Sequence, residues 1–174
     1  MKELFGWIRD ILIAVAIAAI LLAFFKPIVI QQESMQPTFY SGDYVITSRQ
    51  AYNIFGDVQR GDVIIFKTDM YDDQGKPKNL IKRIIGIPGD TVEIIDGYVY
   101  LNGELLEEDY IAEQGISGEM EAVEVPEGKL LVMGDNRRVS LDSRSPEVGA
   151  IDQETIIGKV LVRIYPFSQF KVFR

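Results

Sequence analysis

Residues 33–38, ESMQPT, hold a serine whose hydroxyl could act as a nucleophile. Ser34 lies in a polar stretch that begins shortly after a long apolar run, and Pro37 follows it. Proline lacks an N–H and fixes φ, so it keeps this turn from pairing as a regular strand and leaves the hydroxyl open to a substrate. A serine hydroxyl is a weak nucleophile until a neighbouring base takes its proton. The sequence therefore has to supply such a base.

The composition restricts what that base can be. The 174 residues include no histidine and no cysteine, which excludes Ser-His-Asp triads, thiolate nucleophiles, disulfides and nearly all zinc sites. We expect neither a metal nor another cofactor. The net charge of −8 is spread along the chain without a Lys/Arg run, so nucleic acid is not an expected partner.

Lys82 is the best candidate base, in residues 80–90, LIKRIIGIPGD. Strand alternation places Lys82 on one face with Leu80 and Ile84, so branched aliphatic side chains flank it. Burial disfavours the ammonium form and lowers the pKa, which makes a lysine a competent general base; an arginine such as Arg83 stays protonated. The alternative is an ordinary solvated lysine on an edge strand.

A third polar segment, residues 133–144, MGDNRRVSLDSR, follows an apolar strand directly. It gathers hydroxyl, carboxylate and guanidinium groups within a dozen residues, as an active-site loop does. A polar loop with a local ion pair between Asp142 and Arg144 is the alternative. That alternative gives no reason for the segment to coexist with the other two in a histidine-free chain.

The element that must position Ser34 is the apolar run before it. Residues 11–25 carry no charge and would form a helix of about 22 Å. Extension over residues 5–30, with Arg9 and Lys26 snorkelling, reaches the roughly 30 Å of a hydrocarbon core. A retained membrane anchor is the favoured interpretation, with a cleaved signal peptide and a buried core helix as alternatives; no small-x-small site follows the run.

The charges around this run predict its orientation. Lys2, Arg9 and the amino terminus precede it, and only Lys26 lies close after it, which favours a cytoplasmic start and a domain outside. We therefore expect residues 1–27 to form a cytoplasmic tip and transmembrane anchor in a cell membrane, with the lipid bilayer as a partner. Residues 28–174 would form an extracytoplasmic domain.

That domain is expected to be mainly β, with an antiparallel sheet. Short apolar or β-branched runs alternate with turn residues, and Asp96-Gly97 is a strong hairpin signal. Two polar stretches, residues 68–79 and 104–124, interrupt the pattern and are expected to be surface excursions. The predicted strands cover residues 44–47, 62–66, 80–87, 91–95, 97–101, 129–133 and 157–164.

The three polar segments, residues 60–63 (RGDV) and the anchor occur in an order that resembles type I signal peptidases, the membrane-bound Ser/Lys endopeptidases of bacteria, in their shorter single-anchor Gram-positive-like form. The resemblance covers almost the whole chain. It implies that Ser34 is the nucleophile and Lys82 the general base. It also assigns supporting roles to four residues: Ser140 would orient the lysine amine, Asp142 and Arg144 would brace the site, and Asp135 would help to hold the loop.

The resemblance also implies a substrate and a place to bind it. Members of this family cut secreted preproteins after small residues of the Ala-x-Ala type, so the expected pocket is shallow and apolar. The residues expected to line it are Ile28, Ile30, Met35 and Ile81. The substrate would bind extended beside the strands.

Gln32 departs from the family pattern. Relatives usually carry serine or glycine at this position, and a serine hydroxyl there helps the Ser34 backbone N–H to stabilise the oxyanion.

Two other interpretations of the chain compete with the resemblance. One is a self-cleaving repressor with the same dyad and a related β core, although such proteins lack an anchor and carry a DNA-binding module. The other is a membrane-anchored β binding module whose polar segments are structural.

Overall fold

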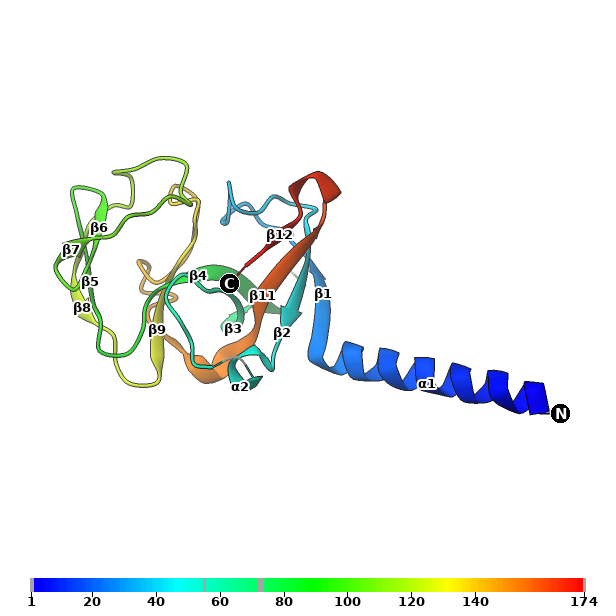
Figure 1. The fold of residues 1–174 in the computed structure, drawn as a ribbon. Helices are drawn as coiled ribbons and strands as arrows, with labels where there is room; N and C mark the ends of the chain where they lie inside the picture. Colours follow the sequence, from blue (N-terminus) through cyan, green and yellow to red (C-terminus); the bar gives the residue numbers. More distant parts are fainter. Residues whose placement is uncertain (1, 55, 72–73, 174) are drawn as a thin grey trace.

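The computed structural model describes residues 2–54, 56–71 and 74–173 (Figure 1). Residues 72 and 73, inside the polar stretch 68–79, and the terminal residues 1 and 174 lie outside the described residues. Its elements are α1 (Lys2–Phe24), β1 (Phe25–Val29), β2 (Tyr44–Ser48), α2 (Ala51–Ile54), β3 (Val63–Tyr71), β4 (Pro77–Gly86), β5 (Thr91–Ile95), β6 (Tyr98–Leu101), β7 (Glu104–Leu105), β8 (Met120–Glu124), β9 (Lys129–Met133), β10 (Ile151–Asp152), η1 (Gln153–Thr155), β11 (Ile156–Tyr165), η2 (Phe167–Gln169) and β12 (Lys171–Val172).

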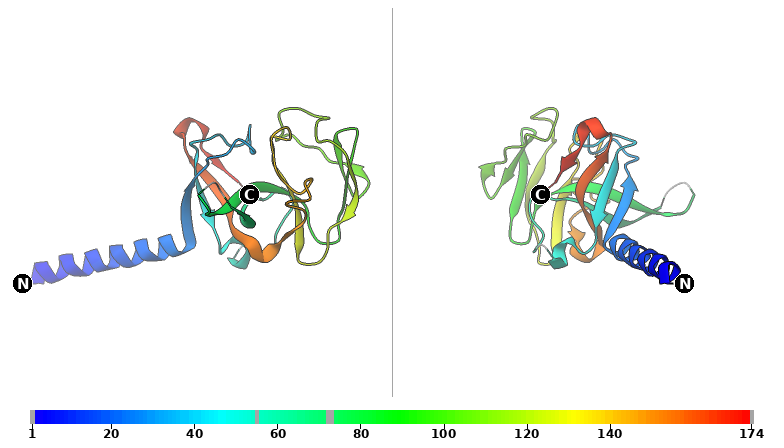
Figure 2. Two further views of the ribbon diagram at one scale, coloured as in Figure 1. Left: turned by 180° about the vertical axis from the view of Figure 1, so that it is seen from behind. Right: turned by 45° about the vertical axis from the view of Figure 1, so that its right-hand side comes forward.

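The strands of the described residues form two antiparallel sheets. The larger, eight-stranded sheet has the order β1-β2-β11-β3-β4-β9-β10, and β12 pairs with β11; the smaller, four-stranded sheet has the order β7-β6-β5-β8. The smaller sheet lies on the side of the molecule away from α1 (Figures 1 and 2). The expected mainly β fold with one amino-terminal apolar helix is confirmed.

Helix α1 ends sooner than expected. Phe25–Val29 is strand β1, which pairs with β2 in the register Pro27↔Ile46, so the expected helical extension to residue 30 is wrong. The physical reason is Pro27, which would remove a hydrogen bond and clash with the preceding turn inside a helix. The sheet thus begins before the expected boundary at residue 28. Within the described chain, residues Gly6–Phe24 form a helix long and apolar enough to cross a membrane, and none of it is buried against the rest of the protein.

Strands also enter the two polar stretches. β3 continues to Tyr71 and β4 begins at Pro77, so the stretch 68–79 holds the exposed ends of a strand pair. The stretch 104–124 begins with β7 and ends with β8. Short, solvent-facing strands such as these have little apolar alternation, and the sequence pattern therefore did not indicate them.

β4 is an interior strand that contributes to all three apolar clusters of the described core. It pairs with β3 on one side, in the register Ile64↔Lys82, and with β9 on the other. Leu80 and Ile84 pack in one cluster, Ile81 in a second and Ile85 in a third. Both faces of β4 are therefore buried where Lys82 lies, which rules out the alternative of a solvated lysine on an edge strand.

Candidate active site

The nucleophile loop joins β1 to β2 and is closed at its base by backbone hydrogen bonds. The Ile30 N–H donates to the carbonyl of Asp43 at 2.9 Å, and the Gly42 N–H donates to the carbonyl of Ile30 at 2.8 Å. Farther along the loop, the Ser34 carbonyl accepts a hydrogen bond of 3.0 Å from the Asn136 N–H. Ser34 is therefore held from two directions, by the sheet below it and by the segment after β9.

Ser34 and Lys82, 48 residues apart in the chain, are in direct contact. The Lys82 Nζ donates to Ser34 Oγ at 2.8 Å and to the carbonyl oxygen of Ile81 at 2.9 Å. The lysine is 1% exposed and the serine 7% exposed. A hydroxyl and an amine at this separation can exchange a proton directly.

Burial lowers the pKa of Lys82 to about 8. The carboxylates of Asp142 and Asp135 act in the opposite direction, because negative charge stabilises the ammonium, but the loss of hydration is larger. The charge of Arg144 adds to the lowering. At pH values near 8 a large fraction of Lys82 is therefore neutral and able to accept a proton.

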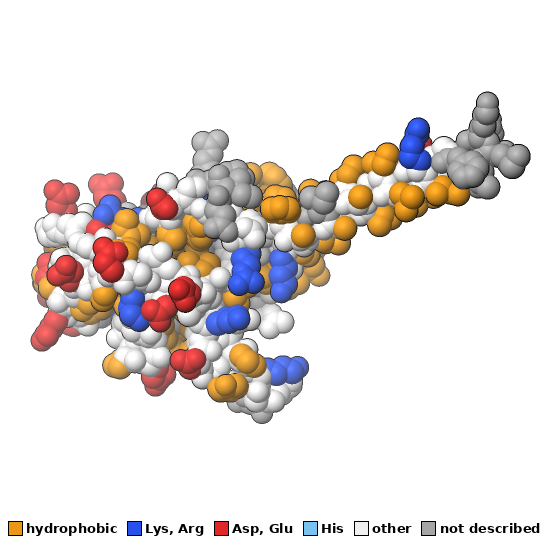
Figure 3. Space-filling model, turned by 90° about the horizontal axis from the view of Figure 1, so that it is seen from below, with side chains coloured by type: hydrophobic (Ala, Val, Ile, Leu, Met, Phe, Trp, Pro, Cys, Tyr) orange, Lys and Arg blue, Asp and Glu red, His pale blue; other side chains and the backbone are white. Residues whose placement is uncertain are grey.

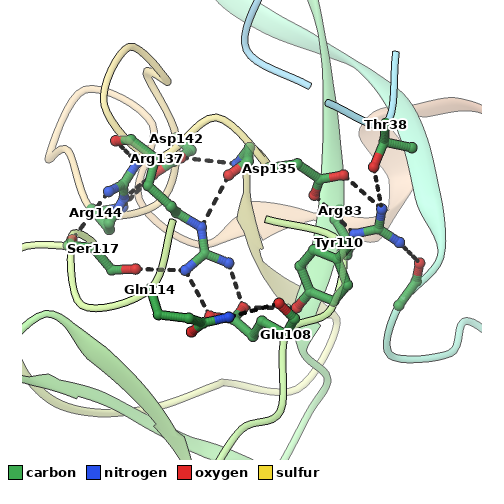
Figure 4. A network of polar contacts seen from close by, with 12 residues as sticks. Thr38, Arg83, Glu108, Tyr110, Gln114, Ser117, Asp135, Arg137, Asp142 and Arg144 are labelled. Atoms are coloured by element: carbon green, nitrogen blue, oxygen red, sulfur yellow. Dashed lines mark hydrogen bonds and ion pairs between the residues drawn. The ribbon is translucent and has the colours of Figure 1, made fainter. Parts of the chain in front are cut away.

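The segment after β9, which we call the catalytic loop (residues 134–144), turns around Asp142. The carboxylate of Asp142 accepts hydrogen bonds from the Gly134 N–H at 2.9 Å and from Arg144 Nε and Nη2, each at 2.8 Å (Figure 4). Burial alone would raise the pKa of Asp142, but the hydrogen bonds and charge of Arg144 lower it. Asp142 and Arg144 thus form an ion pair, and Asp142 connects the end of the loop to its start at Gly134.

Gly134 brings the catalytic loop against the nucleophile. A Cβ at this position would lie 2.2 Å from Ser140 Oγ and 2.4 Å from the Ser34 carbonyl oxygen, so only glycine allows both approaches. The Ser140 hydroxyl is buried and has no hydrogen-bond partner among the described residues. The amine of Lys82 makes no hydrogen bond to it in this structure, so its orienting role stays a prediction.

Asp135 is fixed by Arg83, the neighbour of Lys82 on β4. Arg83 Nε and Nη2 donate to the two carboxylate oxygens of Asp135 at 2.8 and 2.6 Å. This buried pair ties the catalytic loop to the strand that carries Lys82. An arginine cannot serve as the base, and the sequence alone indicated no other role for Arg83. The signal for one was its position between Ile81 and Ile85 on the same face of the strand, where a charge requires a buried carboxylate.

An apolar groove of about 630 Å³ runs beside the dyad. Ile28, Ile30 and Ile81 line it, as expected, whereas Met35 is fully buried in the cluster that contains Ile30 and Ile81 and does not line it. A neighbouring pocket of about 340 Å³ holds Ser34 and Lys82. Half-buried Gln32 lines both spaces and therefore lies where the groove meets the dyad.

The chain is similar to known proteins over nearly its whole length. The family described as "Signal peptidase, peptidase S26" matches residues 4–165. The chain belongs to this family. Among the similar relatives, Signal peptidase I of Bacillus licheniformis is 35% identical over 98% of this chain and 93% of its own length. Signal peptidase IB of Staphylococcus aureus is 38% identical over 98% of this chain and 94% of its own length.

A solved signal peptidase I from Enterococcus faecalis V583 is 33% identical, covering 59% of this chain and 96% of that one, with a TM-score of 0.49. Membership of peptidase S26 makes the chain a serine peptidase. The chain is therefore a hydrolytic enzyme, and the interpretation as a binding module is excluded.

The lowered pKa of Lys82 predicts how peptide cleavage depends on pH. Below a pKa of about 8 the amine is protonated, and turnover should fall about tenfold for each unit of pH; above it turnover should level off. The measurement is kcat between pH 6 and 10, with circular dichroism at each pH to check that the fold persists. A rate that still rises tenfold per unit of pH up to pH 10, as expected for a lysine with the ordinary pKa of about 10.4, would contradict the assignment of a desolvated base.

Proposed function

We propose that this chain is a membrane-bound serine endopeptidase that removes N-terminal signal peptides from secreted preproteins, with Ser34 as nucleophile and Lys82 as general base. The observation that carries the proposal is the 2.8 Å contact between Ser34 Oγ and the buried amine of Lys82. It is supported by the chain's membership of the signal peptidase family.

The reaction follows from this contact. The neutral amine of Lys82 takes the proton of Ser34 as Oγ attacks the scissile carbonyl, and the resulting ammonium returns the proton to the leaving amine when the peptide bond breaks. The signal peptide then remains as an ester on Ser34. A water molecule, deprotonated by the same lysine, attacks this ester and releases the peptide, and Ser34 regains its proton.

The developing oxyanion needs hydrogen-bond donors that are already in place. The Ser34 N–H donates no hydrogen bond to another described residue, and it is therefore the first donor that we propose. Gln32 lies two residues earlier at the edge of the same pocket, and its amide could be the second. Its side chain is longer and more flexible than that of serine, so we favour a backbone N–H as the second donor.

The groove beside the dyad suits the residues before the cut. Ile28, Ile30 and Ile81 give it an apolar wall, and we propose that with Met35 beneath them they favour small side chains such as alanine at the first and third positions. β1 is at the end of the strand order and pairs with β2 alone. Its other edge offers backbone groups to which an extended substrate could bind as an added strand.

The membrane location rests on α1. Apolar side chains cover this helix along its length, while acidic side chains gather on the part of the β body away from it (Figure 3). No described part of the protein buries this apolar surface. We propose that the lipid bilayer of the cell membrane does so, with the chain up to Phe24 as cytoplasmic tip and anchor and the catalytic domain, which begins with β1, on the outside.

Substitutions at the dyad test the proposed chemistry. Ser34→Ala removes the nucleophile and Lys82→Arg replaces a titratable base with a permanent cation, so each should lower cleavage of a purified preprotein by about 10³-fold or more. The double variant should be no worse than either single one, because the pair acts as a unit. Lys129→Arg, on β9 with a surface partner in Asp152, is the control. Substantial turnover by Lys82→Arg would show that another residue is the base.

Substitution of Gln32 tests the oxyanion donors. If a backbone N–H is the second donor, Gln32→Ala should change kcat less than tenfold, and Gln32→Ser should raise it modestly. A donor lost from such a site typically costs about 10² to 10³ in turnover. A loss on that scale in Gln32→Ala, with KM unchanged, would instead identify the glutamine amide as the donor.

Cysteine labelling tests the topology, since the natural chain has none. Asp69, exposed near the end of β3, should react as Asp69→Cys with a membrane-impermeant maleimide in intact spheroplasts. Glu3→Cys, before the apolar run, should react only after lysis. The reverse pattern would place the catalytic domain in the cytoplasm.

A further inference from the structure

The acidic segment between β7 and β8 contains a glutamate that is not on the surface. Glu108 is 4% exposed, whereas its neighbours Glu107 and Asp109 are exposed. Both terminal nitrogens of Arg137 donate to its carboxylate, Nη1 at 3.0 Å to Oε2 and Nη2 to Oε1, and the Tyr110 hydroxyl donates to Oε1 at 2.7 Å. A carboxylate buried this deeply is fixed in place by its donors.

Arg137 carries the contact from Glu108 into the catalytic loop (Figure 4). Its Nε donates to the carbonyl oxygen of Gly134 at 3.0 Å, and its Nη1 also donates to the hydroxyl of Ser117 at 2.6 Å. Gly134 is the residue that lies against both Ser140 Oγ and the Ser34 carbonyl. The planar guanidinium therefore joins the acidic segment to the backbone of Gly134, a residue packed against Ser34.

Two more arginines connect the same segment to the site. The Arg83 guanidinium lies 4.0 Å from the ring centroid of Tyr110 while it holds Asp135. Arg144, which holds Asp142, donates through Nη1 to the Ser117 carbonyl at 3.0 Å. Arg83 and Arg144 thus each contact both the acidic segment and the catalytic loop through their guanidinium groups.

Glu108 is the point where these contacts converge. Its carboxylate accepts hydrogen bonds from Arg137 and from the hydroxyl of Tyr110, whose ring covers the guanidinium of Arg83. Its backbone carbonyl accepts a hydrogen bond of 2.8 Å from Gln114 Nε2 within the same segment. We propose that Glu108 is a positioning residue for the reaction: through Arg137 it holds Gly134, and so the catalytic loop, against Ser34. This inference rests on the proposed function of the dyad.

The effect of Glu108 should appear in turnover more than in substrate binding. Ile28 lies on β1, Ile30 directly after it and Ile81 on β4, so the groove lies outside the acidic segment and the catalytic loop that Glu108 joins. The catalytic loop touches the carbonyl of Ser34, so displacement of the loop misplaces the reacting hydroxyl. A misplacement of about 1 Å can lower a rate about 100-fold.

Glu108→Gln tests this role directly because it keeps the size of the side chain and removes its charge. We expect kcat for preprotein cleavage, per mole of protein folded by circular dichroism, to fall about 100-fold, with KM changed less than about threefold. The matched control is Glu113→Gln. Glu113 belongs to the same segment and pairs with Arg138 of the catalytic loop, but the pair is exposed, so kcat should stay within about twofold of the natural protein.

A double variant separates positioning from support of the fold. Glu108→Leu with Arg137→Met replaces the buried ion pair by apolar side chains, which can restore a stable fold without restoring the charges. We expect its melting temperature to exceed that of Glu108→Gln and its kcat to stay low. Natural kcat in either folded variant, or a loss of activity in Glu108→Gln that matches its loss of folded protein, would overturn the proposal.

Ser34→Ala is measured in parallel, to separate the two proposals. Cleavage by that variant would refute the proposed function. An inactive Ser34→Ala beside a fully active Glu108→Gln would refute the role of Glu108 alone.

Discussion

The amine of Lys82 is buried at a place where a charged ammonium would be costly, and the rest of the site depends on that constraint. An interior strand, paired on both sides and packed on both faces, removes water from the amine and lowers its pKa to about 8. Because burial makes the cation costly, a large fraction of the amine is neutral near pH 8, which is the form that our proposed general base requires. An edge strand could not do this, because water would reach the amine from the open side.

The same desolvation acts on every charge around the dyad, and it explains why the neighbouring arginines are all paired. A buried guanidinium charge without a partner is costly, so Arg83, Arg137 and Arg144 each need a carboxylate within the protein. Asp135, Glu108 and Asp142 supply those carboxylates. The small sheet is part of this arrangement, since the segment between two of its strands provides the partner of Arg137. It therefore contributes to the active site although no residue of it reaches the nucleophile.

The pairing of Ser34 with Lys82 could be anticipated from residue types, because a chain without histidine leaves few bases for Ser34, whereas the supporting and pocket residues were expected only from the family resemblance. The interior strands were also predictable, since their apolar patterns are long. Two features were not. Phe24 and Phe25 are adjacent and equally apolar, so hydrophobicity does not mark the point where α1 ends and β1 begins. Glu108 stands among other acidic residues, and only the third dimension distinguishes it from its exposed neighbours. A buried arginine such as Arg137 needs a buried anion as its partner. That requirement was the one indication of a buried glutamate.

The direct passage from α1 into β1 has a mechanical consequence. Because no residue separates Phe24 from Phe25, the backbone holds the first strand of the sheet directly at the end of the helix. β1 spans about 17 Å, so Ser34 stands at a set height above the end of the helix. If α1 spans a bilayer, the position of the Ser34 hydroxyl relative to the membrane is set by the protein. The thickness of the membrane then decides which peptide bond of a substrate helix lies level with that hydroxyl. The same preprotein would then be cut at a different bond, or not at all, in membranes of different lipid chain length.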